Sequence, residues 1–256
     1  MASTSTYPLP RERALILGVL LALAAVAWLL LLRQSLGMDR AMAMGLTAGM
    51  AAPLFLAMWL AMMVAMMFPT AAPMILVFAR VAAGRREREQ PFVSTWVFVG
   101  GYLVVWTLAG VLAYLLAVAG ERLADRSMWL MDHAAQLGGL LFVAAGVYQL
   151  SPLKDVCLGR CRSPMAFVLH AWRDGAGGAL RMGLEHGLFC LGCCWLLFAI
   201  LFPLGVMNVA AMAAITALIF AEKSWAIGRR VAQAAAVALI AYGIVVALMP
   251  DALPSI

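Results

Sequence analysis

Residues 185–198 read EHGLFCLGCCWLLF and set an acid, a histidine and three cysteines inside a run that is otherwise apolar enough for a membrane. Placing polar and metal-binding side chains inside a membrane costs free energy. Residues of this kind within a membrane span are therefore candidates for a functional site. The stretch therefore indicates both a membrane-spanning helix and a reason to place soft donor atoms within it.

The rest of the chain has the composition of a polytopic membrane protein. Of its 256 residues, 66% are hydrophobic and 12% are charged, whereas a soluble domain is about 45–50% apolar and about 25% charged. We expect one all-α membrane domain over residues 14–250, with a cytoplasmic tail at 1–13 and a short tail at 251–256. The net charge of +6 comes from basic residues between apolar runs, which is typical of topology determinants facing lipid and not of nucleic-acid binding.

Seven apolar runs match or approach the length of about 20 residues that a helix needs to cross the hydrocarbon. The loops that face the cytoplasm hold more Lys and Arg if the N-terminus is inside, so the positive-inside rule predicts a cytoplasmic N-terminus and an outside C-terminus. Between the fourth and fifth runs, residues 164–173 are predicted to form a short interfacial helix. The runs are approximately 14–32, 53–79, 92–119, 134–150, 184–202, 204–221 and 231–249.

The fifth run carries a stripe of metal-binding residues. At about 100° per residue, Met182, His186, Cys190 and Cys193 fall within an arc of about 80°, and Cys194 lies at its edge. At about 1.5 Å per residue, His186 and Cys193 are about 10 Å apart along the axis, so one ion cannot contact both. A single cysteine would be read as a small hydrophobic packing residue, but three within five positions, one turn from a histidine, favour a metal-binding face.

Two more cysteines, Cys157 and Cys161, form a C-x3-C pattern in the connection between the fourth and fifth runs. On the predicted cytoplasmic side they are expected to be thiols, because that compartment is reducing. A spacing of four residues places them about one helical turn apart, close enough to share a soft ion. The alternative is a pair of surface cysteines without a role.

Methionines in the second run supply possible partners for this stripe. Met62 and Met66 lie on one helix face, and Met63 and Met67 form a parallel row beside them. Methionine also fills irregular cores, but 18 methionines are many for this length. We predict that Met66 and Cys190 lie at similar depth and can face each other, and that Met207 lies near the outer end of the sixth run.

The softness of these donors indicates which metal they bind. Thiolate, thioether and imidazole ligands select Cu(I), whereas Mg, Ca or Mn sites need carboxylates, which are almost absent from the runs. Zinc and haem fit this donor set less well. Glu222 and Lys223, at the end of the sixth run, are predicted to form a structural anchor more readily than a proton relay.

The chain resembles a bacterial family of predicted metal-binding integral membrane proteins, long catalogued as a domain of unknown function. Four stretches in the same order carry the resemblance: WLAMMVAMMFPTAAPM, YQLSPLKDVCLGRCRSP, GLEHGLFCLGCCW, and GVMNVAAM followed by AEK. The resemblance implies a multi-pass protein of the bacterial inner membrane that binds metal, without implying a reaction or a ligand set. The matching positions are Met62, Met63, Met66, Met67, Pro69, Lys154, Cys157, Cys161, His186, Cys190, Cys193, Cys194, Met207, Asn208, Glu222 and Lys223.

These observations lead to one main hypothesis and two alternatives. The main hypothesis is a Cu(I)-binding protein that captures, transports or delivers copper through a Met/Cys/His-lined site between the second and fifth runs, with a metallochaperone or cuproenzyme as partner. Such a role is metal binding or transport and not catalysis. The alternatives are a membrane thiol-disulfide oxidoreductase that uses the C-x3-C and C-x2-C-C cysteines, and a haem-binding or assembly subunit with His186 as an axial ligand.

Overall fold

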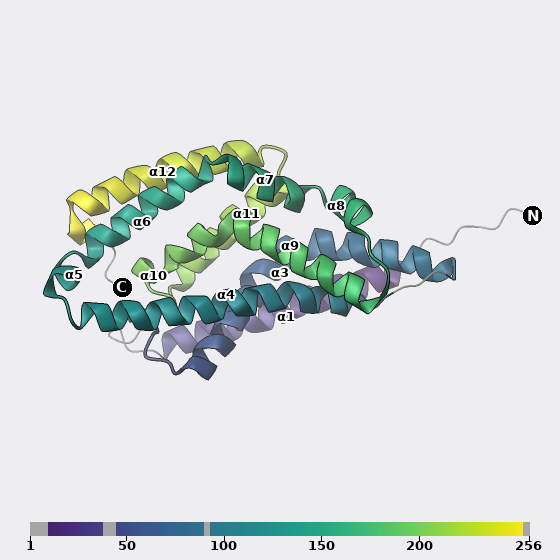
Figure 1. Cartoon of the computed structure of the whole chain (residues 1–256), viewed down its shortest axis with the longest axis horizontal. Coiled ribbons are helices and arrows are strands. Elements are labelled where there is room, and N and C mark those ends of the chain that lie inside the picture. Colours follow the sequence, from purple (N-terminus) through teal and green to yellow (C-terminus); the bar gives the residue numbers. More distant parts are fainter. Residues whose placement is uncertain (1–9, 38–44, 90–92, 253–256) are drawn as a thin grey trace, which may run out of the picture.

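The computed structural model describes residues 10–37, 45–89 and 93–252, and these residues form helices and no strand (Figure 1). Most of the predicted 1–13 tail and residues 253–256 lie outside the described residues. The all-α prediction is confirmed for the described part of the chain. The elements are α1 (Pro10–Leu36), α3 (Ala52–Glu87), α4 (Thr95–Ala124), α5 (Met128–Asp132), α6 (Ala134–Gln149), α7 (Pro152–Arg162), α8 (Pro164–Ala171), α9 (Gly175–Ala199), α10 (Leu201–Leu204), α11 (Val209–Ser224), α12 (Gly228–Leu248) and the 3-10 helix η1 (Pro250–Ala252).

The structure does not support seven membrane spans. Within the described residues, five helices are long and apolar enough to cross a membrane: Arg11–Leu36, Ala52–Arg86, Thr95–Ala124, Gly175–Leu204 and Gly228–Leu248. The predicted spans 134–150 and 204–221 correspond to α6 and α11, which have 16 residues each. At about 1.5 Å per residue such a helix is about 24 Å long, short of the hydrocarbon thickness of about 30 Å. Counting α6 with α7, which bends away by 63°, raises the total to six. The predicted orientation is not supported either.

Two of the five long helices form the interior of the bundle. The most apolar window of α3 is 61% buried and that of the helix containing α9 is 50% buried, compared with 22–28% for α1, α4 and α12. These interior helices are the second and fifth predicted runs, which carry the methionine rows and the cysteine stripe. The candidate ligands therefore lie in the centre of the protein.

Prolines within α3 help to fix its contact with α1. Pro69 lies inside the helix, and because proline has no backbone N–H, the carbonyl of Ala65 one turn earlier lacks its usual helical donor. The indole nitrogen of Trp28 in α1 donates to this carbonyl at 3.1 Å. The hydrogen bond links α1 to α3 next to the methionine rows.

Glycines allow α4 and α9 to approach until their backbones touch. A Cβ atom on Gly101 of α4 would overlap the carbonyl oxygen of Leu180, and one on Gly183 of α9 would overlap the carbonyl oxygen of Phe98. Such close contact is the usual role of small residues between membrane helices. It holds the cysteine stripe of α9 directly against α4.

The same kind of contact joins α6 to α12, which run side by side along one edge of the bundle (Figure 1). A Cβ atom on Gly243 of α12 would lie 2.6 Å from the carbonyl oxygen of Gly139 in α6. The short α6 thus makes backbone contact with the last long helix of the chain.

The connection predicted as an inner loop is helical. Ser151 caps the start of α7 by accepting a hydrogen bond from the backbone nitrogen of Lys154, and α7 packs against α9 and α11. The predicted interfacial helix 164–173 is present as α8, but it packs against α3 and buries Phe167 and Val168. Both segments therefore contribute to the core.

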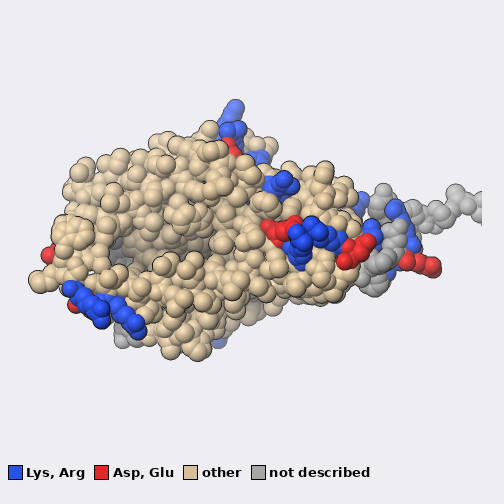
Figure 2. Space-filling view, viewed as in Figure 1, with Lys and Arg blue, Asp and Glu red and all other residues tan. Residues whose placement is uncertain are grey.

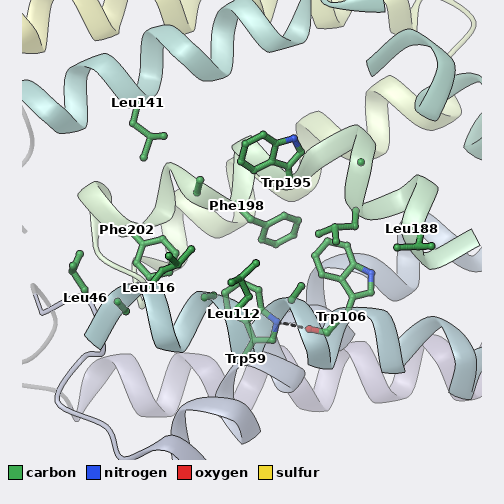
Figure 3. Close-up of a pocket in the computed structure, with 16 residues that line it drawn as sticks. Leu46, Trp59, Trp106, Leu112, Leu116, Leu141, Leu188, Trp195, Phe198 and Phe202 are labelled. Carbon is green, nitrogen blue, oxygen red and sulfur yellow. Dashed lines mark hydrogen bonds between the residues drawn. The ribbon is translucent and has the colours of Figure 1, made fainter. Parts of the chain in front are cut away.

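On the face shown in Figure 2, charged side chains gather at the ends and along one edge, and the broad region between them is uncharged and hollowed. An apolar groove of about 560 Å³ opens between α4, α6 and α9 (Figure 3). Trp106, Trp195 and Phe198 line it, and the indole nitrogen of Trp59 donates to the Trp106 carbonyl at 2.9 Å. No cysteine, histidine or methionine lines this groove, so the candidate ligands do not face it.

Candidate metal centre

The three cysteines of α9 are fully buried at the centre of the bundle. Cys190 is 0% exposed, and Cys193 and Cys194 are nearly so. The thiols of Cys193 and Cys194 both donate to the backbone carbonyl of Cys190, at 3.1 and 2.8 Å. This local bonding gathers all three side chains around one turn of the helix, including Cys194, which helical arithmetic places at the edge of the stripe.

The cysteines of α7 meet those of α9. The Cys161 side chain interacts with the thiols of Cys190 and Cys193. Cys157 is buried next to Gly192, where an added Cβ atom would lie 2.8 Å from its sulfur. The connection that we predicted as an inner loop is the helix α7, which turns back onto α9 and brings Cys157 against it. None of the five cysteines forms a disulfide.

A methionine of α3 completes a sulfur pair with Cys190. The thiol of Cys190 lies 4.0 Å from the thioether sulfur of Met67. We expected Met66 at this position; the structure instead turns the neighbouring Met67 toward α9. The other predicted sulfur ligands are buried as well, in α3, in α9 and in the turn before α11: Met62, Met63, Met66, Met182 and Met207.

Two polar groups from other helices also reach Cys190. The Tyr102 hydroxyl of α4 is hydrogen-bonded to its sulfur at 3.2 Å, and the Lys223 ammonium of α11 donates to the same sulfur at 3.1 Å. Sequence reasoning placed Lys223 in an anchor near the membrane edge and did not consider Tyr102. The signal for Lys223 was available, because a charged residue within an apolar run is a functional candidate by default.

Beside Lys223, a buried ion pair joins three helices. Lys154 of α7 binds Glu222 of α11 at 2.7 Å, and both side chains are almost fully buried. Gln149, the last residue of α6, donates to Glu222 at 2.9 Å and accepts from Lys154. Glu222 is thus an anchor, as predicted, but its partner is Lys154 and not Lys223. The network holds α7, and with it Cys161, against the cysteine cluster.

His186 lies one turn before Cys190 in a cage of aromatic rings. Its ring centroid is 5.9 Å from Phe98, 5.5 Å from Tyr102 and 5.7 Å from Phe167. Both ring nitrogens are buried and neither has a hydrogen-bond partner. The Tyr102 ring therefore contacts His186 while its hydroxyl contacts Cys190.

The donor set is sulfur-rich and poor in carboxylate. Among the described residues, no three side chains of His, Cys, Asp or Glu are grouped so that they would hold one ion. Cys190 and Met67 instead form a cysteine–thioether pair, which suits a soft monovalent ion better than Zn²⁺ with its four ligands.

Together, these features define an all-helical protein whose long apolar helices are compatible with a membrane and enclose a cluster of soft sulfur donors. Residues 56–246 match the family PpoB2, which is described as a copper chaperone, and the chain belongs to this family. No curated protein and no solved structure matches the chain. Membership associates the protein with copper, as the donor chemistry predicted.

Proposed function

We propose that the protein binds Cu(I) as its cargo between Cys190 and Met67 and delivers it to an acceptor. The observation that carries the proposal is the buried 4.0 Å contact between these two sulfur atoms from the two interior helices. The family description as a copper chaperone supports delivery, and the long apolar helices are compatible with a setting in a membrane. A bacterial inner membrane is part of the proposal.

The spacing of the two sulfur atoms is suited to a shared ion. For metal–sulfur bonds of about 2.3 Å, a sulfur–sulfur distance of 4.0 Å corresponds to an angle of about 120° at the metal. This angle leaves room for a third donor in the same plane. Cys161 and Cys193 both interact with the Cys190 thiol, and these two sulfur atoms are therefore our candidates for the third donor.

The surroundings of Cys190 suit a copper ion that has to stay in the Cu(I) state while it is bound and is later released to an acceptor. Burial keeps water and oxidants from the thiol. The thiolate, not the thiol, is the metal ligand, and the Lys223 ammonium at 3.1 Å provides a counter-charge for a deprotonated Cys190 while the site is empty.

The test is an anaerobic Cu(I) titration of the purified protein against a competing chelator. Met67→Leu removes one donor with little change in shape. We expect it to lower copper affinity by at least about ten-fold, since mutation of a residue that merely supports a metal ligand typically costs that much. Cys190→Ser should abolish binding at this site. Met66→Leu is the matched control, since Met66 is equally buried, and its affinity should equal that of the wild type.

Equal affinities for Met67→Leu and Met66→Leu would contradict the proposal. So would an absence of stoichiometric copper in the wild-type protein. Thiol trapping in cells then distinguishes the redox alternative: a thiol-disulfide oxidoreductase requires a disulfide that forms and breaks among the five cysteines, whereas the copper site requires free thiols.

A further inference from the structure

His186 has a feature that packing alone does not explain. Both nitrogens of its ring are buried without a partner, although the great majority of buried polar atoms in proteins are hydrogen-bonded. The three rings around it, Phe98, Tyr102 and Phe167, offer only apolar contacts. A phenylalanine would fill this cage without burying polar atoms that lack a hydrogen-bond partner. The imidazole nitrogens therefore indicate a ligand that binds here.

The position of His186 on α9 indicates which ligand. Residues four apart on a helix are neighbours, with Cβ atoms about 5–6 Å apart. His186 has Cys190 one turn later and Met182 one turn earlier, and all three side chains are buried on one face. Imidazole and thioether are both donors that Cu(I) accepts. The face thus presents Met182 and His186 as one donor pair, one turn before Cys190, whose own partner is Met67 of α3.

We propose that His186 and Met182 form a second Cu(I) site, one helical turn from the Cys190–Met67 site, and that copper passes between the two along α9. This inference rests on the proposed function, since it takes Cu(I) as the cargo. The spacing of one turn allows an ion to bind the next donor before it leaves the last one. The aromatic cage keeps water away from the ion during the step.

The path has a direction within the fold. From Cys190, His186 and Met182 lead toward the start of α9. Phe167 of α8 contacts His186, and Trp172, just after α8, stacks on Phe78 of α3 at 5.4 Å. The second site therefore lies on the side of the cysteine cluster toward the start of α9, in contact with Phe167 of α8.

The experiment is an anaerobic Cu(I) titration of the full-length protein, combined with X-ray absorption spectroscopy to detect nitrogen bound to copper. We expect the wild type to bind a second ion with one nitrogen donor. His186→Phe should lose that ion and the nitrogen signal and keep the first ion. Cys190→Ser should lose the first ion and keep the nitrogen signal. His170→Phe, at an exposed histidine of α8, is the control and should behave as the wild type.

If His186→Phe folds poorly, Met182→Leu provides an independent variant. It should lower the affinity for the second ion by at least about ten-fold, since even the loss of an outer-shell partner of a metal site typically costs about that much. Binding of the first ion should be unchanged. The second site is overturned if copper in the wild type has no nitrogen ligand, or if His186→Phe binds as many ions as the wild type. A failure of the proposed function looks different: in that case Cys190→Ser binds copper as the wild type does, or the wild type binds none.

Discussion

Replacing Lys154 by methionine is the sharpest test of how the cysteine cluster is held together. The substitution keeps an unbranched side chain, one atom shorter, and removes the ammonium that binds Glu222 at 2.7 Å; the two side chains of this pair are only 1% and 2% exposed. Glu222 then retains only the amide of Gln149, at 2.9 Å. Breaking a buried pair by removing one partner costs about 3–5 kcal/mol, because the other charge stays buried and uncompensated. For a chain of this size, the melting temperature should fall by about 6–20 °C.

The assay is thermal unfolding in detergent, followed by the reactivity of the cysteines toward a thiol reagent, since four of the five are buried until the protein opens. The double variant Lys154→Met with Glu222→Gln should recover much of the loss, because an uncharged pair no longer strands a carboxylate. The control is Arg229→Met, which breaks the exposed pair with Asp155 and should cost under about 1 kcal/mol.

The reasoning fails if Lys154→Met lowers the melting temperature no more than Arg229→Met does. It also fails if the double variant loses more stability than the two single substitutions lose when their effects are added. Copper titration adds a second readout. If the ion pair positions α7, Lys154→Met should also weaken Cu(I) binding, because Cys161 leaves the cluster when α7 shifts.

Three further predictions follow from contacts described above. Gly101→Ala places a methyl group against the Leu180 carbonyl, and this overpacking should lower the free energy of unfolding by about 1–3 kcal/mol. The control is Gly100→Ala, whose methyl group meets nothing within 4 Å and should leave stability unchanged or raise it by up to about 1 kcal/mol. Thermal unfolding compares the two variants. Trp28→Phe leaves the Ala65 carbonyl without its donor and should cost about 1–3 kcal/mol in the same assay, an effect that a stability equal to wild type would disprove. Tyr102→Phe removes the hydroxyl next to Cys190 and keeps the ring on His186, so copper affinity at the first site should change while the nitrogen signal remains; loss of that signal would contradict this separation of roles.

Local periodicity in the sequence was sufficient to predict the helical fold and the buried faces. The stripe from Met182 to Cys193 depends only on the repeat of one helix, so its burial followed directly from the spacing. The cap of α11 was predictable for the same reason: Asn208 accepts a hydrogen bond from Ala211, three residues later. The bounds of α6 were predicted to within one residue, but α11 begins at Val209, five residues after the predicted start, because the apolar residues before Asn208 form a turn.

Contacts between helices could not be predicted, because they depend on how each helix is rotated. Met66 and Met67 differ by about 100° around α3, and the rotation that selects Met67 is set by contacts such as the bond from Trp28 to Ala65. The return of α7 onto α9 depends on a network of Gln149, Lys154 and Glu222 that spans 73 residues of sequence between its ends. No local pattern encodes such a meeting.

The glycine contact between α6 and α12 also has a consequence for biosynthesis. A chain is synthesised from its N-terminus, so α6 leaves the ribosome long before α12, and alone it is too short to span the hydrocarbon. Its backbone contact at Gly139 has no partner until Gly243 has been made. We therefore expect that a nascent chain ending before Gly228 fails to integrate α6 stably, a point that protease protection of truncated chains would test. The last helix thus supplies the partner that α6 needs, so the pair of helices along this edge of the bundle forms only after α12 has been synthesised.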